Sequence, residues 1–193
     1  MSFLPLERLK RTLEGYIDAK DNTRPERVAK VFAPDAVLTL SLATANITFP
    51  SRTVGAEAIA KTLVSDFGLQ YAQCRTYYVC DTLHAANGQI DALPWLVLMR
   101  EPATGALRVG HGVYRWTFDG VARVTGFHIH IARMDVVPDA DAKLLAQLQD
   151  ALDYPWLAPA ALREYFETLA RKTPAPAFID AFAVPAAAPS AQA

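Results

Sequence analysis

Apolar positions in the first third of the chain recur at helical spacing. They predict a helix over residues 5–20, with charged residues on its other side. Asn22-Thr23 before Pro25 predicts a second helix that runs to about Phe32, because proline is favoured in a first helical turn. Residues 55–67 predict a third helix. The apolar stripe of the first predicted helix is Leu6, Leu9, Leu13, Tyr16 and Ile17. The apolar stripe of the third is Ile59, Leu63 and Phe67.

The middle of the chain changes to the alternating pattern of strands. We expect a short hairpin of residues 36–42 and 47–54, followed by longer strands over 71–83 and 92–101 and a long hairpin over 107–134. After Pro138 the pattern becomes helical again over 139–153 and 159–172, and from Thr173 onward the composition shifts to Ala and Pro. Helices followed by a run of strands indicate an α+β fold with a mostly antiparallel sheet.

The long hairpin carries three of the four histidines and turns at Asp119-Gly120. A two-residue Asp-Gly loop favours a type I′ turn, which would pair His111 with His128. One face would then carry His111, Val113, Arg115, His128 and His130. The other face would carry large apolar side chains: Tyr114, Trp116, Phe118, Phe127, Ile129 and Ile131.

A bulged three-residue turn is the alternative for this hairpin. It would shift the register by one residue, so that His111 and Arg115 share a face with Phe127 and Ile129. His128 would then lie on the outer face of the sheet, with His130.

Three phrases give the chain a family resemblance: YIDAKDNTRPERVAKVFAPDAVL at 16–38, GAEAIAKTL at 55–63 and GHGVYRWTFDG at 110–120. Their order and spacing resemble the nuclear transport factor 2-like superfamily, closest to its SnoaL-like and scytalone dehydratase-like branch. The resemblance implies a cone-shaped, strongly curved mixed sheet with N-terminal helices on its concave face, covering residues 1–137. Residues 138–172 would form a C-terminal helical extension, and 173–193 an Ala/Pro-rich tail.

The dehydratase resemblance bears on Asp18 in particular. The phrase Ile17-Asp18-Ala19-Lys20-Asp21 is similar to the site helix of that branch, and Asp18 matches its acid. The branch's catalytic histidine falls near Cys74 or Arg75 here, and its second histidine has no counterpart, so the specific dehydration is not expected.

A cone of this kind implies an apolar cavity with a few polar groups, the usual form of a small-molecule site. We expect Asp18 and His111 to act as a proton-transfer pair, because a neutral imidazole titrates near working pH. The residues expected to line the pocket or bind substrate are Tyr16, Tyr78, Trp95, Arg115, Phe127, His128 and Ile129. The predicted function is a lyase, isomerase or cyclase that needs no cofactor and acts on a hydrophobic or polyketide-like molecule. The alternative is a non-catalytic binding or dimerisation module, since the same fold hosts both.

Composition narrows the range of partners. A formal net charge of −1 without a basic stripe argues against nucleic acid, and no apolar run is long enough to span a membrane. The N-terminus lacks the layout of a signal peptide, and Cys74 and Cys80 suit free thiols in a reducing cytoplasm. His-x-His at 128–130 has no carboxylate or cysteine placed to complete a metal site, so no metal is expected. We expect a homodimer through the outer face of the sheet.

Overall fold

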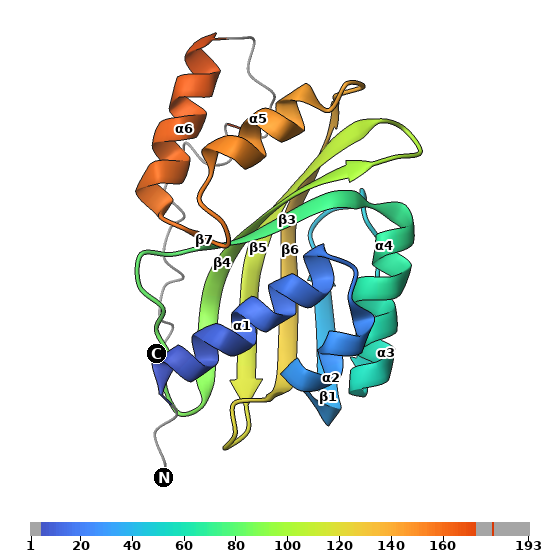
Figure 1. Cartoon of the computed structure of the whole chain (residues 1–193), viewed down its shortest axis with the longest axis vertical. Coiled ribbons are helices and arrows are strands. Elements are labelled where there is room, and N and C mark those ends of the chain that lie inside the picture. Colours follow the sequence, from blue (N-terminus) through green and yellow to red (C-terminus); the bar gives the residue numbers. More distant parts are fainter. Residues whose placement is uncertain (1–4, 173–178, 180–193) are drawn as a thin grey trace.

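A strongly curved seven-stranded sheet forms the centre of the computed structural model, which describes residues 5–172 and residue 179 (Figure 1). The sheet order is β2-β1-β6-β5-β4-β3-β7, with β1 parallel to β6, β7 parallel to β3, and every other neighbouring pair antiparallel. The strands are β1 Phe32–Leu42, β2 Arg52–Val54, β3 Ala72–Val79, β4 Gln89–Glu101, β5 Ala106–Phe118, β6 Val124–Pro138 and β7 Trp156–Leu157.

Helices cover both faces of this sheet. The long helix α1 crosses the inner, concave face, and the helices before β1 and β3 pack beside it (Figure 1). The C-terminal helices lie on the opposite, outer face. The helices are α1 Leu6–Asp21, η1 Pro25–Arg27, α2 Val28–Val31, α3 Ala56–Ala60, η2 Lys61–Ser65, α4 Asp66–Gln70, α5 Lys143–Ala151 and α6 Pro159–Lys172. The predicted α+β class and the curved, mostly antiparallel sheet are therefore confirmed.

One predicted strand is wrong in extent. Residues 47–54 were expected to pair along their length with β1, but only Arg52–Val54 form a strand, in register with Val37–Thr39. The preceding segment turns Ile47 and Phe49 inward, where they pack against the core. For this preceding segment, burial of the Ile47 and Phe49 side chains thus replaces the regular hydrogen-bond ladder expected with β1.

Two hydrophobic layers lie on the two sides of the sheet. On the inner face, Trp116 and Phe127 stack with ring centroids 3.6 Å apart, and the Tyr16 ring of α1 meets Phe127 edge-on at 5.2 Å. On the outer face, Leu96 and Val109 pack against the C-terminal helices in a second cluster. The central strands therefore carry apolar side chains on both faces wherever helices cover them.

The long hairpin differs from the expected register. His111 pairs with Arg133 rather than with His128, and Arg115 pairs with His128 instead. Because the displacement at that pair is an even number of residues, each side chain keeps the face predicted from the two-residue turn. The alternative register, which would put His111 and Arg115 beside Phe127, is wrong.

The turn accounts for most of the displacement, and a register shift between Thr117 and Phe118 supplies the last residue. The Asp119 carboxylate accepts hydrogen bonds from the backbone N–H groups of Val121 and Arg123, at 3.0 and 2.9 Å. Ala122 adopts a left-handed conformation with φ 62°, so the loop closes over more residues than the type I′ turn predicted for Asp119-Gly120. A short acidic side chain that bonds to its own turn is a common alternative to a tight hairpin.

The described part of the C-terminal region comprises residues 138–172 and residue 179. Ile179 is buried in the outer-face cluster, whereas the remaining positions of the Ala/Pro-rich tail, 173–178 and 180–193, lie outside the described residues. Within the described residues, no helix has the length and apolar character needed to cross a membrane.

Candidate small-molecule site

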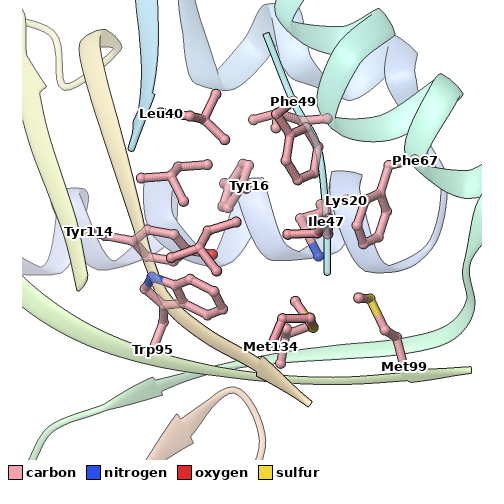
Figure 2. A pocket seen from close by; sticks show the side chains of 14 residues that line it. Tyr16, Lys20, Leu40, Ile47, Phe49, Phe67, Trp95, Met99, Tyr114 and Met134 are labelled. Carbon is pink, nitrogen blue, oxygen red and sulfur yellow. The ribbon is translucent and has the colours of Figure 1, made fainter. Parts of the chain in front are cut away.

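An apolar cavity lies between the inner face of the sheet and α1, with a volume of about 40 Å³ (Figure 2). Side chains from β1, β4, β5, β6, α1, η2, α4 and the segment before β2 enclose it. They are Tyr16, Lys20, Leu40, Ile47, Phe49, Leu63, Phe67, Trp95, Val97, Met99, Tyr114, Ile129, Ile131 and Met134. Among these fourteen side chains, Lys20 is the one that carries a charge at neutral pH.

Lys20 reaches this wall because it continues the apolar stripe of α1. Leu9, Leu13, Tyr16 and Lys20 follow one another at spacings of three or four residues, which places them on one helix face. The Lys20 side chain is 8% exposed, and its ammonium donates to Thr76 Oγ1 at 2.9 Å and to Cys74 Sγ at 3.2 Å. Its Nζ also lies 4.4 Å from the centroid of the Phe67 ring, a cation–π contact.

Asp21 is the counter-charge of Lys20 and the centre of a hydrogen-bond network. Its carboxylate lies 3.3 Å from Lys20 Nζ and is only 2% exposed. It accepts from the Thr76 backbone N–H at 2.6 Å, the Thr76 hydroxyl at 2.9 Å and the Cys74 thiol at 3.3 Å. The Tyr154 hydroxyl, from the C-terminal extension, donates a further bond at 2.9 Å. A buried carboxylate held by this many donors is fixed in one position.

The network sets the charge states of its members. Burial alone would lower the pKa of the Lys20 ammonium, but the Asp21 carboxylate beside it outweighs burial and raises that pKa. Burial, with Asp21 beside it, raises the pKa of the Cys74 thiol to about 12. At neutral pH the wall therefore presents an ammonium group, and Cys74 is an un-ionised thiol that reacts slowly.

Two residues that line the cavity carry donors without partners. The Tyr16 hydroxyl and the Trp95 indole N–H are buried and make no hydrogen bond to a described residue. Burial raises the pKa of the Tyr16 hydroxyl, and the opposing effect of Tyr114 does not outweigh it. The Tyr16 hydroxyl is nevertheless not in hydrogen-bonding geometry with Tyr114. Because an unsatisfied buried donor costs about 1–3 kcal/mol, two of them beside an ammonium group favour an acceptor in the cavity.

The residues that were predicted to line a pocket and that lie on the inner face are found at or near this cavity. Tyr16, Trp95 and Ile129 line it. Phe127 lies behind the lining in the aromatic layer, and the Tyr78 hydroxyl is occupied by the Leu13 carbonyl at 2.9 Å. These five side chains come from α1, β3, β4 and β6, so the curvature of the sheet brings them together.

The predicted pair Asp18 and His111 is not brought together. Asp18 points away from Lys20 on α1 and binds Arg24 at 2.9 Å and Arg27 at the surface. Burial would raise the pKa of the Asp18 carboxyl, but Arg27 and Arg24 outweigh burial and lower it. His111 is on the outer face of β5, where burial and Arg133 lower its pKa. The sheet separates these two groups, and neither lines the cavity.

His128 and Arg115 also lie on the outer face. The His128 ring contacts the Thr39 and Ser41 hydroxyls at 2.8 and 3.1 Å, and Ser41 is also 2.8 Å from His130. Arg115 pairs with Asp91 at 2.8 Å. We call Thr39, Ser41, Arg115, His128 and His130 the outer polar strip.

Sequence reasoning missed Lys20, Asp21, Cys74 and Thr76. A signal for Lys20 was present, because a lysine that extends an apolar helical stripe has no solvated face to occupy. Nothing local marked Cys74 or Thr76, which reach Lys20 only because β3 runs beside α1. Among residues 5–172 and 179, no three His, Cys, Asp or Glu side chains are arranged to hold a metal ion.

No family model and no curated protein matches the sequence. Solved structures do match the fold. A hexachlorocyclohexane dehydrochlorinase from Novosphingobium barchaimii is similar with a TM-score of 0.55 and 11% identity, over 68% of this chain and 88% of that one. A nuclear transport factor 2-like protein of unknown function from Burkholderia pseudomallei gives 0.53 and 16%, over 68% and 92%. A putative isomerase from Bacillus subtilis gives 0.52 and 13%, over 67% and 89%. At these identities the likeness establishes the fold alone.

Proposed function

Because the chain has the nuclear transport factor 2-like fold, we propose that it binds a compact, mostly apolar carbonyl compound in the cavity below α1. The observation that carries this proposal is the set of three donors, Lys20, Tyr16 and Trp95, in an otherwise apolar lining. A carbonyl oxygen at the Lys20 ammonium group would gain a charged hydrogen bond, and the two unpaired donors give a ligand further groups to bind. The rest of the ligand would contact aliphatic, aromatic and thioether side chains.

The activity that we propose is of the lyase, isomerase or cyclase type and needs no cofactor. Negative charge that develops on a carbonyl oxygen would be stabilised by the Lys20 ammonium, which Asp21 and Thr76 hold in place. Fixed donors in a site that excludes water stabilise such charge without reorganisation, which is commonly the largest catalytic contribution. The dehydrochlorinase and the putative isomerase among the similar structures are consistent with this class.

Non-catalytic binding is the second candidate, and one observation favours it. The fourteen lining residues include no carboxylate and no imidazole, and Lys20 is protonated at neutral pH. The cavity thus offers donors but no ready proton acceptor. A protein that binds a carbonyl compound without converting it would need no more than this.

Acetophenone is a suitable probe, with binding followed by ligand-observed NMR. We expect Lys20→Met to weaken binding roughly tenfold, since a hydrogen bond to a charged group contributes about 1.5–3 kcal/mol. Lys30→Met is the matched control, because Lys30 is an exposed lysine of α2. Equal affinities of the wild type and Lys20→Met would contradict the proposed site.

Turnover is tested separately, by exchange of the acetophenone methyl protons in deuterated water. If the site stabilises an enolate, a base from the buffer takes the methyl proton, and the wild type will accelerate exchange whereas Lys20→Met will not. Binding without acceleration would support the non-catalytic candidate instead.

We also propose a homodimer that forms through the outer polar strip, and a reducing, cytoplasmic location. The dimer is supported by the strip itself, which offers five polar side chains on the outer face. The location is supported by the two cysteines, which are both free thiols. Arg115→Glu should weaken the dimer in sedimentation velocity, whereas Arg52→Glu on β2 should not. A monomeric wild type at high concentration would contradict the dimer.

A further inference from the structure

A second hollow of about 160 Å³ adjoins the cavity. Ile47, Phe49 and Phe67 line both spaces, so a single layer of side chains separates them. Figure 2 shows these three side chains on the side of the cavity where Lys20 enters. We call this layer the partition and the larger space the outer hollow.

The partition is built from side chains that can move without unfolding the sheet. The Phe49 and Phe67 rings stack with centroids 6.4 Å apart and planes 15° apart, and Phe67 in turn contacts the Lys20 ammonium. Ile47 and Phe49 belong to residues 43–51, which form neither helix nor strand. Phe49 is half-buried rather than locked in the core. Rotation of these rings would join the two spaces directly at Lys20.

The two spaces differ in chemistry. Apart from its three donors and Tyr114, the cavity is lined by apolar side chains, whereas the outer hollow presents the hydroxyls of Thr48 and Thr62 and the amide of Gln70. Asp66 also lines the outer hollow, but Lys61 neutralises it at 2.6 Å. Uncharged groups that both donate and accept therefore dominate the outer hollow, and a hydroxyl is their simplest complement.

The volumes decide how a ligand can fit. A space of 40 Å³ holds about three water molecules, far below the several hundred Å³ of most ligand sites. A ketone larger than a few atoms that reaches Lys20 must therefore displace the partition. Once it does, the outer hollow is the adjoining space into which the molecule can extend.

We infer that the outer hollow is the second half of the ligand site, entered through the partition, and that it binds a hydroxylated end of the ligand. This inference rests on the proposed function and narrows its substrate class to amphipathic ketones. The carbonyl end lies in the cavity at Lys20, the middle of the molecule replaces the Phe49–Phe67 contact, and the hydroxyl meets Thr62.

Two isosteric probes test the hydroxylated end: acetophenone with a para-hydroxyethoxy group and acetophenone with a para-propoxy group. In the wild type we expect the hydroxyethoxy compound to bind about fivefold more tightly than its hydrophobic isostere, the effect of one hydrogen bond. Thr62→Val should remove this advantage, while Leu69→Ala, at an exposed position of the neighbouring helix, should keep it. Equal affinities of the two probes for the wild type would overturn the inference and leave the proposed function standing.

The route through the partition has a readout that needs no ligand. Cys74 Sγ lies 3.2 Å from Lys20 Nζ, so its labelling by methyl methanethiosulfonate in a Cys80→Ser background reports access to this end of the cavity. We expect Phe49→Ala to label several-fold faster than Leu69→Ala at matched thermal stability. If neither probe binds any variant, the proposed function fails; equal labelling rates in the two variants would overturn the entrance itself.

Discussion

At the scale of single residues, two acids of α1 have opposite surroundings although they are three positions apart. Asp18 is partly exposed and pairs with two surface arginines, whereas Asp21 is buried beside Lys20. The resemblance pointed to Asp18, but the helix turns that residue away from the sheet. The acid that holds a cavity group is therefore Asp21.

Asp21→Asn should lower the pKa of Lys20, because burial then acts without its counter-charge. We also expect a loss of about 3 kcal/mol in the free energy of unfolding, since removal of one partner leaves a buried charge unpaired. Urea denaturation and NMR of the Lys20 ammonium group measure the two effects. Asp18→Asn is the matched control and should cost less than about 1 kcal/mol, as exposed ion pairs do. Equal losses in the two variants would contradict the assigned roles.

His128 gives the protein a pH dependence of known sign. Burial lowers its pKa from 6.5, and Arg115 and His130 lower it further. The unfolded chain therefore binds the proton more readily, so stability is full above pH 6.5 and falls as the pH drops below it. We expect His128→Gln to reduce the fall in thermal stability between about pH 6.5 and 5, while His111, whose pKa is also lowered, retains the rest. His84→Gln, at an exposed position, should retain the wild-type slope.

At the scale of elements, the β5–β6 hairpin depends on one close backbone approach. The register shifts between His111 and Gly112, and a Cβ atom at Gly112 would lie 1.9 Å from the His130 carbonyl oxygen. Any side chain at this position must push the two strands apart. The glycine thus permits the irregularity, in which Ala132 of β6 is the extra residue between the pairs His111–Arg133 and Gly112–Ile131.

Gly112→Ala should cost about 3 kcal/mol or more, the range for backbone clashes in a packed sheet. Chemical denaturation measures the loss. Gly120→Ala is the control within the same hairpin, because a Cβ atom there meets nothing within 4 Å. If both variants were as stable as the wild type, the strands would not be as close as described.

At the scale of the whole molecule, the C-terminal extension is joined to both the outer face and the site. α5 and α6 cover the outer apolar layer, while Tyr154 between them donates to Asp21 on the inner side. The extension and the cavity are thereby linked through one carboxylate.

Leu148→Ala should lower the free energy of unfolding by about 3 kcal/mol, because Leu148 is fully buried against the outer face. Leu144→Ala, in the same helix but only partly buried, should cost clearly less. Comparison of the two urea midpoints decides this. A small effect at Leu148 would mean that α5 is not packed on the sheet as a structural layer.

The sequence by itself determined the class of the fold and the face of most side chains. Helical and alternating periodicities are local, and an error of an even number of residues in the hairpin register left His128 and Tyr114 on their predicted faces. The extent of β2 and the turn at Asp119 could not be predicted, since side-chain burial and a carboxylate-to-backbone contact outweighed the local pattern.

Only the tertiary structure decided which polar groups share the cavity. Lys20 and Cys74 are 54 positions apart, and the curvature of the sheet alone places β3 beside α1. His111 lies on the outer face of the sheet and Asp18 on the surface of α1, although each residue type suits catalysis. The sequence states which side chains are present. Which of them lie close together depends on the packing of distant strands and helices, and the candidate site depends on that packing.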